Sequence, residues 1–396
     1  MCPHAPKLSS LRIATARAPE LSYIRAMFDK AYSGSRVLIT GHTGFKGSWL
    51  TFWLLRLGAH VTGYALDPPT VPSLFARSGL TAHIDDVRGD IRDRDRLREL
   101  LRSKNFDFIF HLAAQPLVRS SYSDPLNTFD VNIMGTAALL DAIRSAEHAC
   151  ACVMVSTDKC YENNEWQFGY REVDSLGGHD PYSASKGAME IVVHSYRRCF
   201  FHEGPIRIAS ARAGNVIGGG DWQVDRIVPD VVRALESDSP VSVRNPNSLR
   251  PWQHVLEPLS GYLWLGAKLA GKNGHNFASP WNFGPISHDL HTVAELVDTA
   301  LAVWGGGRWE CKSEEYAPHE AGLLRLSIDK ASLHLRWRPV WSFDEAVKRT
   351  MGWYRGDLHS TNGVETLCEA DLVAYCEAAR RAGVAWLQSV QPAVPA

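Results

Sequence analysis

The sequence predicts an α/β protein built on a doubly wound parallel sheet, with a smaller α/β domain toward its C-terminal side. Short apolar runs of strand length alternate with longer segments of helical periodicity through the first half of the chain. The first run, residues 37–40, breaks into a glycine-rich turn that leads directly into a helix-compatible segment. Because strands that alternate with helices favour parallel pairing through helical crossovers, these observations indicate a parallel sheet covered on both faces.

Length and composition narrow the class of protein. The 396 residues suffice for one large and one smaller domain, and the formal net charge is −1. This balance gives no electrostatic case for binding nucleic acid or an anionic membrane surface. The eight cysteines form no C-x-x-C pair, which favours reduced thiols in a cytoplasmic protein without a metal site. No apolar run approaches transmembrane length.

Four segments are predicted along the chain. Residues 1–32 form a leader that is either disordered or precedes a true start at Met27, because the early residues lack a packing pattern and a signal-peptide core. Residues 33–215 carry the sheet and a dinucleotide, and residues 216–356 form a substrate domain whose chain can cross back to the sheet. Residues 357–396 form a helical tail that packs outside the core.

The turn after the first strand predicts a dinucleotide-binding βαβ unit. Gly41 allows the tight turn, Gly44 lets backbone N–H groups approach a pyrophosphate, and Gly47 lets the helix pack against the strand. The pyrophosphate then lies at the positive end of the helix dipole. The positions assigned to the cofactor in this turn are Gly41, Thr43, Gly44, Phe45, Lys46 and Gly47.

The next two strands predict the adenosine end of this site. The strand at residues 60–65 leads to Asp67, twenty residues after Gly47, where a carboxylate can accept the ribose hydroxyls. A carboxylate there repels a 2′-phosphate, so NAD is favoured over NADP. A third strand at residues 83–87 leads to Asp90 and Ile91, which either hold the adenine ring or belong to a plain loop.

A fourth strand, residues 106–112, ends in small residues. Ala113 and Ala114 permit close approach of a cofactor, and Gln115 is assigned to the substrate. The following apolar helix, residues 127–146, carries Asn132, whose amide must be satisfied and is expected to brace a neighbouring backbone beside the cofactor.

The fifth strand, residues 152–155, delivers polar groups to the same edge of the sheet. Ser156, Thr157, Asp158 and Lys159 supply hydroxyl, carboxylate and amine groups at its carboxyl end. Such groups are too polar for core filling, so a site is predicted; the resemblance given below implies that Ser156 lies beside the cofactor and that the other three act in catalysis.

The helix that follows carries Tyr182 and Lys186, which are four residues apart and share one face. An ammonium group beside a phenol stabilises the phenolate and lowers the pKa of the tyrosine toward working pH. Both residues are assigned to catalysis and to cofactor binding.

The second half of the chain is less informative. A sixth strand, residues 206–211, leads to a glycine-rich bend in which Asn215 is assigned to the sugar or pyrophosphate. Several arginines could meet phosphate, but only Arg250, within Arg-Pro-Trp-Gln, is favoured over a solvated surface role. A strand and turn at residues 281–285 carry Asn282. For the loop pair His319 and Glu320 a structural role is slightly favoured.

Together these motifs resemble the extended short-chain dehydrogenase/reductase superfamily, in its sugar-nucleotide branch, over roughly residues 33–355. Three stretches, residues 41–49, 156–161 and 250–258, are similar to the CDP-glucose 4,6-dehydratase family. The resemblance implies a Rossmann-type fold, a tightly held NAD that is recycled in each turnover, CDP-glucose as substrate, and a place in dideoxyhexose synthesis for bacterial O-antigen polysaccharide. It also places Asn282 near the nucleotide.

The resemblance further implies roles for individual residues. Tyr182, supported by Lys186, takes the proton of the sugar 4-hydroxyl, and Thr157 binds the C4 oxygen. Asp158 is the acid for loss of the C6 hydroxyl. Lys159 stands where related dehydratases carry a glutamate that takes the C5 proton, and it either acts as that base or merely pairs with Asp158 or a phosphate.

Two alternatives and one expected assembly accompany this interpretation. Another sugar-nucleotide dehydratase or a 4-epimerase could use the same scaffold, although an epimerase needs no acid and base after Thr157. A binding module that senses NAD without chemistry is a remote alternative. The apolar helices at residues 127–146 and 185–201 have more hydrophobic surface than one sheet face needs, which predicts a homodimer or higher homo-oligomer through a four-helix interface.

Overall fold

The computed structural model describes residues 23–145, 148–286, 289–312, 322–359 and 363–390. Its centre is a seven-stranded sheet in the order β11-β6-β5-β4-β1-β2-β3, with every neighbouring pair parallel. In chain order the strands are β1 (Arg36–Thr40), β2 (His60–Ala65), β3 (Asp85–Arg88), β4 (Phe108–His111), β5 (Cys150–Val155), β6 (Ile206–Ala213) and β11 (Pro280–Phe283). The predicted fold class is therefore confirmed.

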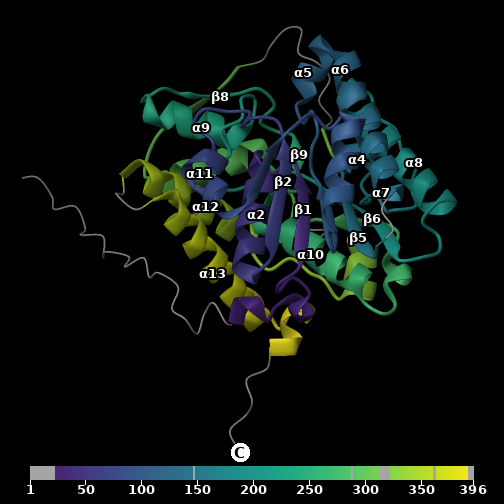
Figure 1. Cartoon of the computed structure of the whole chain (residues 1–396). Coiled ribbons are helices and arrows are strands. Elements are labelled where there is room, and N and C mark those ends of the chain that lie inside the picture. The colour runs from purple at the N-terminus through teal and green to yellow at the C-terminus, as the bar shows by residue number, and fades with distance from the viewer. Residues whose placement is uncertain (1–22, 146–147, 287–288, 313–321, 360–362, 391–396) are drawn as a thin grey trace, which may run out of the picture.

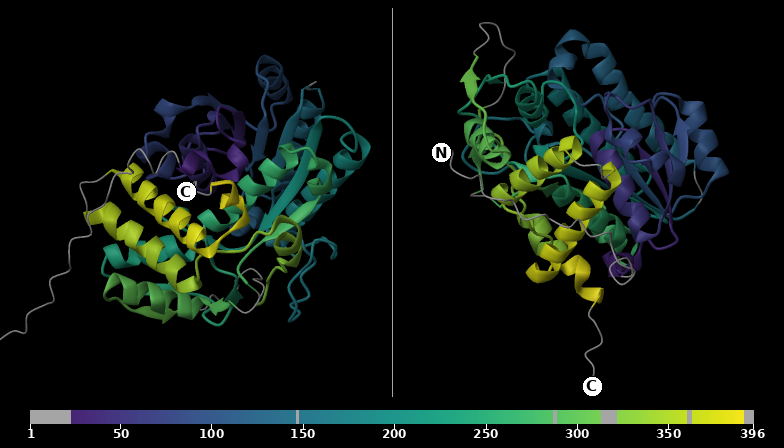
Figure 2. Two further views of the ribbon diagram at one scale, coloured as in Figure 1. Left: turned by 90° about the horizontal axis from the view of Figure 1, so that it is seen from below. Right: turned by 90° about the vertical axis from the view of Figure 1, so that its left-hand side faces the viewer.

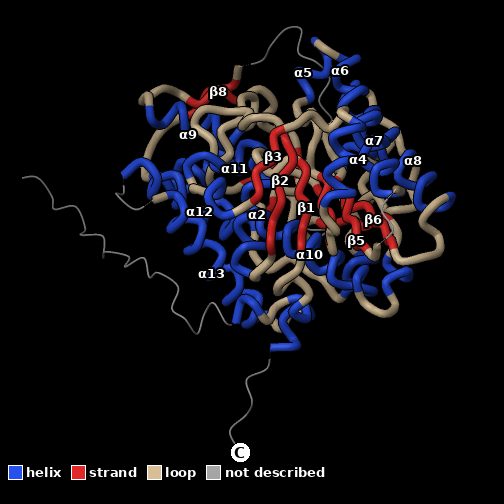
Figure 3. The backbone as a smooth tube through the Cα atoms, viewed as in Figure 1, coloured by secondary structure: helices blue, strands red, loops and turns tan. Residues whose placement is uncertain are grey.

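Helices connect these strands and enclose the sheet, as the red strands inside blue helices show in Figure 3. In chain order they are α2 (Phe45–Leu57), α3 (Leu74–Arg77), α4 (Arg94–Ser103), α5 (Val118–Ser123), α6 (Pro125–Phe129), α7 (Gly135–Arg144), α8 (Pro181–Cys199), α9 (Ile227–Glu236), α10 (Leu256–Ala270), α11 (Val293–Trp304), α12 (Phe343–His359) and α13 (Val364–Ala382).

Alternation along the strands separates two cores. In β1, Val37 and Ile39 join the core that lies against α2 and α10, whereas Leu38 joins the core against α4, α7 and α8. Figure 1 shows α4, α7 and α8 on one side of the sheet and α2 with α12 and α13 on the other. Strands buried on both faces need apolar residues at consecutive positions, which explains why they appear in the sequence as short unbroken apolar runs.

The predicted helix at residues 127–146 is interrupted in the structure. It consists of α6, a π-helical turn (Asp130–Met134) and α7, with helical backbone at both junctions. Asn132 lies in the π-helical turn and is buried. A π turn widens the helix locally and is frequent beside functional sites, so its position next to the carboxyl edge of the sheet is informative.

The structure corrects the predicted leader. Residues 1–22 lie outside the described residues, but the part of the leader from residue 23 onward packs into the protein. Met27 and Phe28 are buried, and the Phe28 ring stacks on Trp386 near the other end of the chain at a centroid distance of 5.0 Å. The boundary at residue 32 was wrong because these apolar residues bury against a partner that is remote in sequence.

The predicted tail is helical, but it does not lie outside the core. Its helix α13 packs against α12, and the two run side by side in both views of Figure 2. Leu372, Tyr375 and Cys376 of α13 belong to the same hydrophobic core as α2 and α10. Glu257 in the first turn of α10 accepts a hydrogen bond from the Tyr375 hydroxyl at 2.8 Å, which ties the tail to the centre of the molecule.

Beyond β6 the chain builds a second lobe and then crosses back to the sheet. The lobe contains α9, α11 and short strand pairs formed by β7 (Val216–Ile217) with β10 (Gln253–His254), β8 (Val241–Val243) with β13 (Trp309–Cys311), and β9 (Leu249–Arg250) with β12 (His291–Thr292). Between these pieces, α10 packs under β5 and β6, and β11 forms an edge of the sheet. No helix in the described ranges is long and apolar enough to cross a membrane.

Candidate active site

A cleft with a cavity volume of about 1030 Å³ lies between the carboxyl edge of the sheet and the second lobe. It is lined by the turns that follow β1, β2, β3, β4 and β5, by the start of α8, and by residues of the second lobe. In parallel α/β sheets ligands bind at this edge, because helix N-termini and loop residues converge there. Most of the residues assigned from sequence meet in this one cleft.

The glycine turn fits a dinucleotide pyrophosphate. Gly41 has φ +79°, and a Cβ there would lie 2.6 Å from the backbone nitrogen of Ala113, so both the turn and the neighbouring strand require glycine. A Cβ on Gly47 would lie 2.1 Å from the Gly41 carbonyl oxygen. Helix α2 begins at Gly44 without a side-chain cap, which leaves its first N–H groups for a ligand.

The remaining residues assigned to this turn also line the cleft. Thr43 donates its hydroxyl hydrogen bond to the Leu66 carbonyl at 3.0 Å, which fixes the glycine turn to the end of β2. Phe45 and Lys46 face the same cavity. Burial, followed by the charge of Arg226, lowers the pKa of Lys46 to about 8.

The adenosine corner is built from the ends of β2 and β3. Asp67, Asp90 and Ile91 line the cleft, and the Asp90 carbonyl accepts a hydrogen bond from the Tyr64 hydroxyl at 2.8 Å. Hydrogen bonds from Arg92 are the largest influence on Asp90 and hold its pKa below the usual range. With its exposed carboxylate at the end of β2, this corner suits a ribose with free hydroxyls.

The end of β4 supports the site from behind. Ala113 and Ala114 line the cleft, whereas Asn132 braces the chain: its Oδ1 accepts from the Gln115 backbone N–H at 2.9 Å, and its Nδ2 donates to the Ser185 hydroxyl at 2.8 Å. Gln115 does not line the cleft. Its side-chain amide is used within the loop, by Thr128 and the Leu117 backbone, so this arrangement does not support its assignment to the substrate, which stays a prediction.

The end of β5 places Ser156, Thr157, Asp158 and Lys159 in the cleft. The Thr157 hydroxyl donates to Asp158 Oδ1 at 2.9 Å, whereas Asp158 Oδ2 has no hydrogen-bond partner among the described residues. Burial raises the pKa of Asp158, and the nearby ammonium of Lys159 is the first influence that opposes it. A buried carboxyl with one unpaired oxygen at a cleft is suited to donate a proton to a ligand.

Tyr182 and Lys186 both line the cleft from the first two turns of α8. The helix is fixed there by its N-cap Asp180, which accepts from the Ser183 backbone N–H at 2.9 Å, and by the Tyr182 N–H, which donates to the Ser121 hydroxyl at 3.1 Å. These contacts hold the pair at the end of β5, close to Thr157.

The predicted lowering of the tyrosine pKa is wrong for this structure. Burial raises the pKa of Tyr182 to about 12, and a hydrogen bond with Thr157 is the first influence that opposes burial. Lys186 Nζ lies 3.7 Å from Met189 Sδ, and burial lowers the pKa of Lys186 to about 8. Desolvation, which shared helix spacing does not reveal, therefore outweighs the attraction expected between phenolate and ammonium.

One turn beyond Lys186, a buried ion pair lies behind the cleft. Glu190 Oε2 accepts from Arg212 at 2.9 Å and from the Ser210 hydroxyl at 2.7 Å, and both ionic side chains are 3% exposed. The charge of Glu190 raises the pKa of Lys186 and so opposes the effect of burial. Arg212 also donates to the Tyr161 hydroxyl at 2.7 Å, which extends the network toward β11.

Asn282 belongs to this internal network. Its Oδ1 accepts from the Tyr161 hydroxyl at 2.8 Å, and its Nδ2 donates to the carbonyls of Tyr170 and Ser327. The residue is fully buried and does not line the cleft, so the structure does not support its assignment to the substrate, which stays a prediction. The turn that resembles a substrate loop instead carries a structural amide here. His319 and Glu320 lie outside the described residues.

Cations from both parts of the chain line the cleft. Asn215 and Arg250 lie there as predicted, together with Arg226 and Arg244 of the second lobe, for which a solvated surface role was favoured, and Arg119 of α5, which the sequence did not single out. Arg119 Nε and Arg244 Nη1 lie 3.8 Å and 3.1 Å from the same oxygen of Asp225, across the mouth of the cleft. Three cations from separate segments suit a diphosphate, but nothing in their local sequence distinguishes them from surface arginines.

Comparisons with known proteins place the chain. The family described as GDP-mannose 4,6 dehydratase matches residues 38–350. A CDP-glucose 4,6-dehydratase from Salmonella typhimurium (strain LT2) is 47% identical over 336 residues, which cover 83% of this chain and 93% of the relative. A dTDP-glucose 4,6-dehydratase from Streptomyces antibioticus is 29% identical over 340 residues, 81% of this chain and 92% of the relative.

Solved structures agree on the fold. A dTDP-glucose 4,6-dehydratase from Bacillus anthracis, solved in complex with NAD, has a TM-score of 0.69 at 20% identity and covers 82% of this chain and 97% of its own. A dTDP-glucose 4,6-dehydratase from Streptomyces venezuelae, also solved with NAD, has a TM-score of 0.68 at 24% identity, with 81% and 97% covered.

Proposed function

Because the chain belongs to the GDP-mannose 4,6-dehydratase family of the extended short-chain dehydrogenase/reductase superfamily, we propose that it is a CDP-glucose 4,6-dehydratase. The reaction converts CDP-D-glucose to CDP-4-keto-6-deoxy-D-glucose and water. The 47% identical Salmonella relative supports the substrate. The buried Asp158, with an unpaired oxygen beside Thr157 in the cleft, is the observation that carries the elimination chemistry.

The cofactor of this proposal is NAD, which when bound would supply the hydride acceptor for C4 of the sugar and the hydride donor for C6. The residues present fit this group: the glycine turn and the uncapped start of α2 would hold its pyrophosphate, and Asp67 would accept its ribose hydroxyls. Ala113 and Ala114 leave space beside it at the end of β4.

The chain's own residues then share three proton transfers in the cleft. Tyr182, as its phenolate, takes the 4-hydroxyl proton, and Lys186 supplies positive charge that opposes the effect of burial on this phenolate. Thr157 would turn its hydroxyl hydrogen from Asp158 to the C4 oxygen. The C4 ketone acidifies the C5 proton, so elimination follows. Asp158 gives its proton to the departing C6 hydroxyl, which leaves as water, and burial, by raising the pKa of Asp158, favours this direction of transfer. Lys159, beside it, either accepts the C5 proton, for which it must first lose its own proton, or pairs with Asp158 or a phosphate.

The substrate diphosphate is assigned to the second lobe. Arg250 is nearly buried in the cleft, and Asn215 lies beside it at the bend that closes over the sugar. Arg226 and Arg244 add positive charge from the same lobe. The division into a cofactor segment, residues 33–215, and a substrate segment, residues 216–356, is part of this proposal.

We also propose that two chains associate through α7 and α8, which lie on the outer side of the sheet in Figure 1. Large apolar side chains are exposed along this side, among them Met134, Ile191 and Phe200. Packing of these helices against a second copy would bury them in a four-helix interface. Sedimentation at micromolar concentration should give a dimer, and the variant I191E/F200E should give a monomer. A monomeric parent protein would reject this assembly.

Two broader assignments rest on the family alone. The 4-keto-6-deoxy sugar nucleotide suits further reduction to dideoxyhexoses of bacterial O-antigen polysaccharide, and the chemistry of NAD and sugar nucleotides suits the cytoplasm. Both are part of the proposal.

The substrate is tested with purified protein, NAD, and CDP-glucose, dTDP-glucose, UDP-glucose or GDP-mannose in separate tubes. Proton NMR follows loss of the C6 hydroxymethyl signal and growth of a methyl doublet. A methyl doublet from CDP-glucose alone is the expected result. A doublet from a different nucleotide sugar would support the dehydratase reaction but reject cytidine as the nucleoside of the substrate. Inversion at C4 without a methyl signal would support the 4-epimerase alternative. Binding without turnover would support the non-catalytic module.

A further inference from the structure

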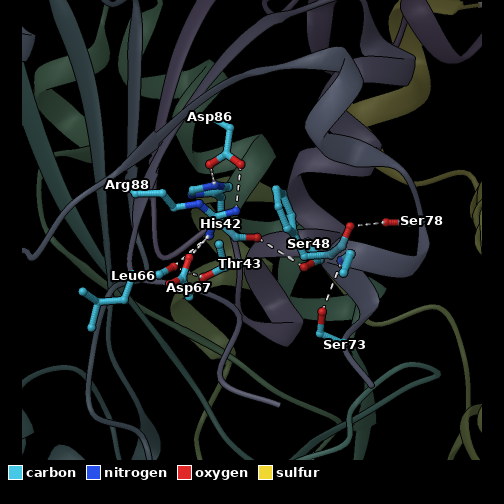
Figure 4. A network of polar contacts seen from close by, with 11 residues as sticks. His42, Thr43, Ser48, Leu66, Asp67, Ser73, Ser78, Asp86 and Arg88 are labelled. Carbon is cyan, nitrogen blue, oxygen red and sulfur yellow. Dashed lines mark hydrogen bonds and ion pairs between the residues drawn. The ribbon is translucent and has the colours of Figure 1, made fainter. Parts of the chain in front are cut away.

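The guanidinium of Arg88 lies next to the carboxylate of Asp67, which is expected to bind the ribose of the cofactor. Asp67 follows β2 at the cleft, and its side chain is 92% exposed. Arg88, the last residue of β3, has its Nη1 3.8 Å from Asp67 Oδ1. Figure 4 shows the guanidinium of Arg88 between the carboxylates of Asp67 and Asp86. Arg88 is not itself among the residues that line the cleft, but it contacts the one carboxylate there that is expected to bind the ribose hydroxyls.

The guanidinium of Arg88 is held in place by neighbours other than Asp67. Its Nη2 donates to Asp86 Oδ2 at 2.7 Å, and its Nη1 donates to the Leu66 carbonyl at 3.0 Å. Its central carbon lies 5.3 Å from the centre of the Phe75 ring. Asp86 is in turn fixed by the buried ring of His42, whose Nε2 lies 2.9 Å from Asp86 Oδ1. Removal of Asp67 would thus leave Arg88 oriented.

We propose that Arg88 is a second specificity-determining residue of the cofactor site, one that binds a ribose 2′-phosphate when the Asp67 carboxylate is absent. With Asp67 present, its negative charge repels a 2′-phosphate and offsets the positive charge of Arg88. Without it, a phosphate on the same ribose oxygen would take the space of the carboxylate, within reach of a guanidinium that donates in a planar fork. The inference rests on the proposed NAD site.

The test compares binding of NAD and NADP by calorimetry to nucleotide-free protein and to the variants D67S, R88Q and D67S/R88Q. We expect D67S to lose about tenfold in NAD affinity and to gain about 10- to 100-fold in NADP affinity, because charge-assisted hydrogen bonds to phosphate contribute on this scale. In D67S/R88Q the NADP gain should disappear. R88Q alone should change NAD affinity by less than about threefold, as for an exposed ion pair.

Matched variants separate this effect from a general change of surface charge. Asp85 lies on the same strand as Arg88 but at its amino end, where it pairs with Lys104 at 2.5 Å. D85S should leave both affinities unchanged. D67N keeps the shape of Asp67, and it should show the same direction of change as D67S if D67S folds poorly.

Three results would overturn the inference. These are no gain of NADP affinity in D67S and D67N, an equal gain in D67S/R88Q, or an equal gain in D85S. Failure of the NAD site itself has a different signature, because the parent protein would then bind neither nucleotide.

Discussion

Two buried carboxyl groups near the Tyr182–Lys186 pair behave in opposite ways. Asp158, at the cleft, is 2% exposed, and Glu190, behind it, is 3% exposed. Burial raises the pKa of Asp158, whereas the pKa of Glu190 is lowered below its usual value despite burial because Arg212 lies beside it. Similar burial thus accompanies a pKa shift toward the neutral form for Asp158 and toward the anion for Glu190.

The partners of the two groups explain this difference. Glu190 Oε2 receives hydrogen bonds from a guanidinium and a hydroxyl within an enclosed network. Asp158 receives one hydrogen bond, from Thr157. Each group has one oxygen without a hydrogen-bond partner among the described residues, Asp158 Oδ2 and Glu190 Oε1, so the difference is the guanidinium that contacts Glu190. A carboxyl without a contacting cation favours its neutral form, and at a cleft its proton is available to a ligand. The partner, rather than burial, therefore decides the role of each group.

The largest expected effect on activity comes from substitution of Asp158, the carboxyl group at the cleft. D158N keeps the shape of the side chain but has no acidic proton, so product formation from CDP-glucose should fall about a thousandfold, as for removal of a general acid. The rate of growth of the product methyl signal measures this. The thermal midpoint should stay close to that of the parent protein, since the amide oxygen of the new side chain can still accept from Thr157; retained turnover in a folded D158N would contradict the assignment.

The space around Asp158 is the next test. A Cβ on Gly214 would lie 2.8 Å from Asp158 Oδ2 and 2.8 Å from Pro251 Cγ. G214A should therefore displace the carboxyl group and lower kcat by about 10- to 100-fold, because small misplacements of a catalytic group are costly. The control is G352A on α12, where no described atom approaches within 4 Å of the new Cβ; equal activity of the two variants would contradict the account.

The carboxylate of Glu190 should affect both the free energy of unfolding and the pH dependence of kcat. Glu190 raises the pKa of Lys186, so E190Q lowers that pKa, and Lys186 loses its proton at lower pH. The alkaline limb of kcat against pH should move to lower pH. E190Q also leaves Arg212 buried without its anion, which should cost about 3 kcal/mol in the free energy of unfolding.

A double variant separates these two consequences. E190Q/R212M removes both buried charges, so the free energy of unfolding should recover in part, while the displaced alkaline limb should persist. If stability recovers and the pH profile returns to that of the parent protein as well, Glu190 would have no electrostatic role at Lys186.

The smallest effect on activity is expected at a third buried carboxyl, far from the cleft. Burial raises the pKa of Glu257 to about 7, yet its oxygens accept from the backbone N–H groups of Val340 and Trp341 and from Tyr375. E257Q leaves part of this donor set unpaired and should lower the free energy of unfolding by about 1–3 kcal/mol. The kcat of E257Q should be unchanged, because Glu257 does not line the cleft. A lowered kcat would contradict the view that a raised pKa must be combined with a position at the cleft to identify the catalytic acid.

The sign of the pH dependence at Glu257 also follows. A folded-state pKa above the unfolded value of 4.5 means that this group stabilises the folded state most below pH 4.5, and that the contribution is lost as pH rises to about 7. Thermal midpoints measured across this range should fall more steeply with pH in the parent protein than in E257Q.

Much of the site was predictable because its chemistry depends on local sequence. The spacing of Gly41 and Gly47 predicts that the backbone needs glycine at both positions. In the structure a Cβ would lie 2.6 Å from a backbone atom at Gly41 and 2.1 Å from one at Gly47, which agrees. The position of Asp158 after a buried strand, and the one-turn spacing of Tyr182 and Lys186, place side chains at the carboxyl edge through strand and helix geometry alone.

What could not be predicted depends on contacts between distant segments. Gln115 and Asn282 have the polar amides of substrate ligands, but each is satisfied by partners that only the fold brings near. Tail residue Tyr375 reaches Glu257 across more than a hundred positions, so sequence periodicity could not show that the tail is core. The pKa of Tyr182 depends on desolvation, which requires the whole surrounding structure.

The central claim is that Asp158 serves the elimination and Tyr182 the preceding oxidation. The most direct measurement mixes excess CDP-glucose rapidly with NAD-loaded parent protein, D158N or Y182F and follows the absorbance of reduced nicotinamide. The account predicts that reduced nicotinamide accumulates in D158N without a product methyl signal, and that Y182F shows neither. Failure of D158N to reduce the cofactor, or product formation by D158N at the parent rate, would contradict it.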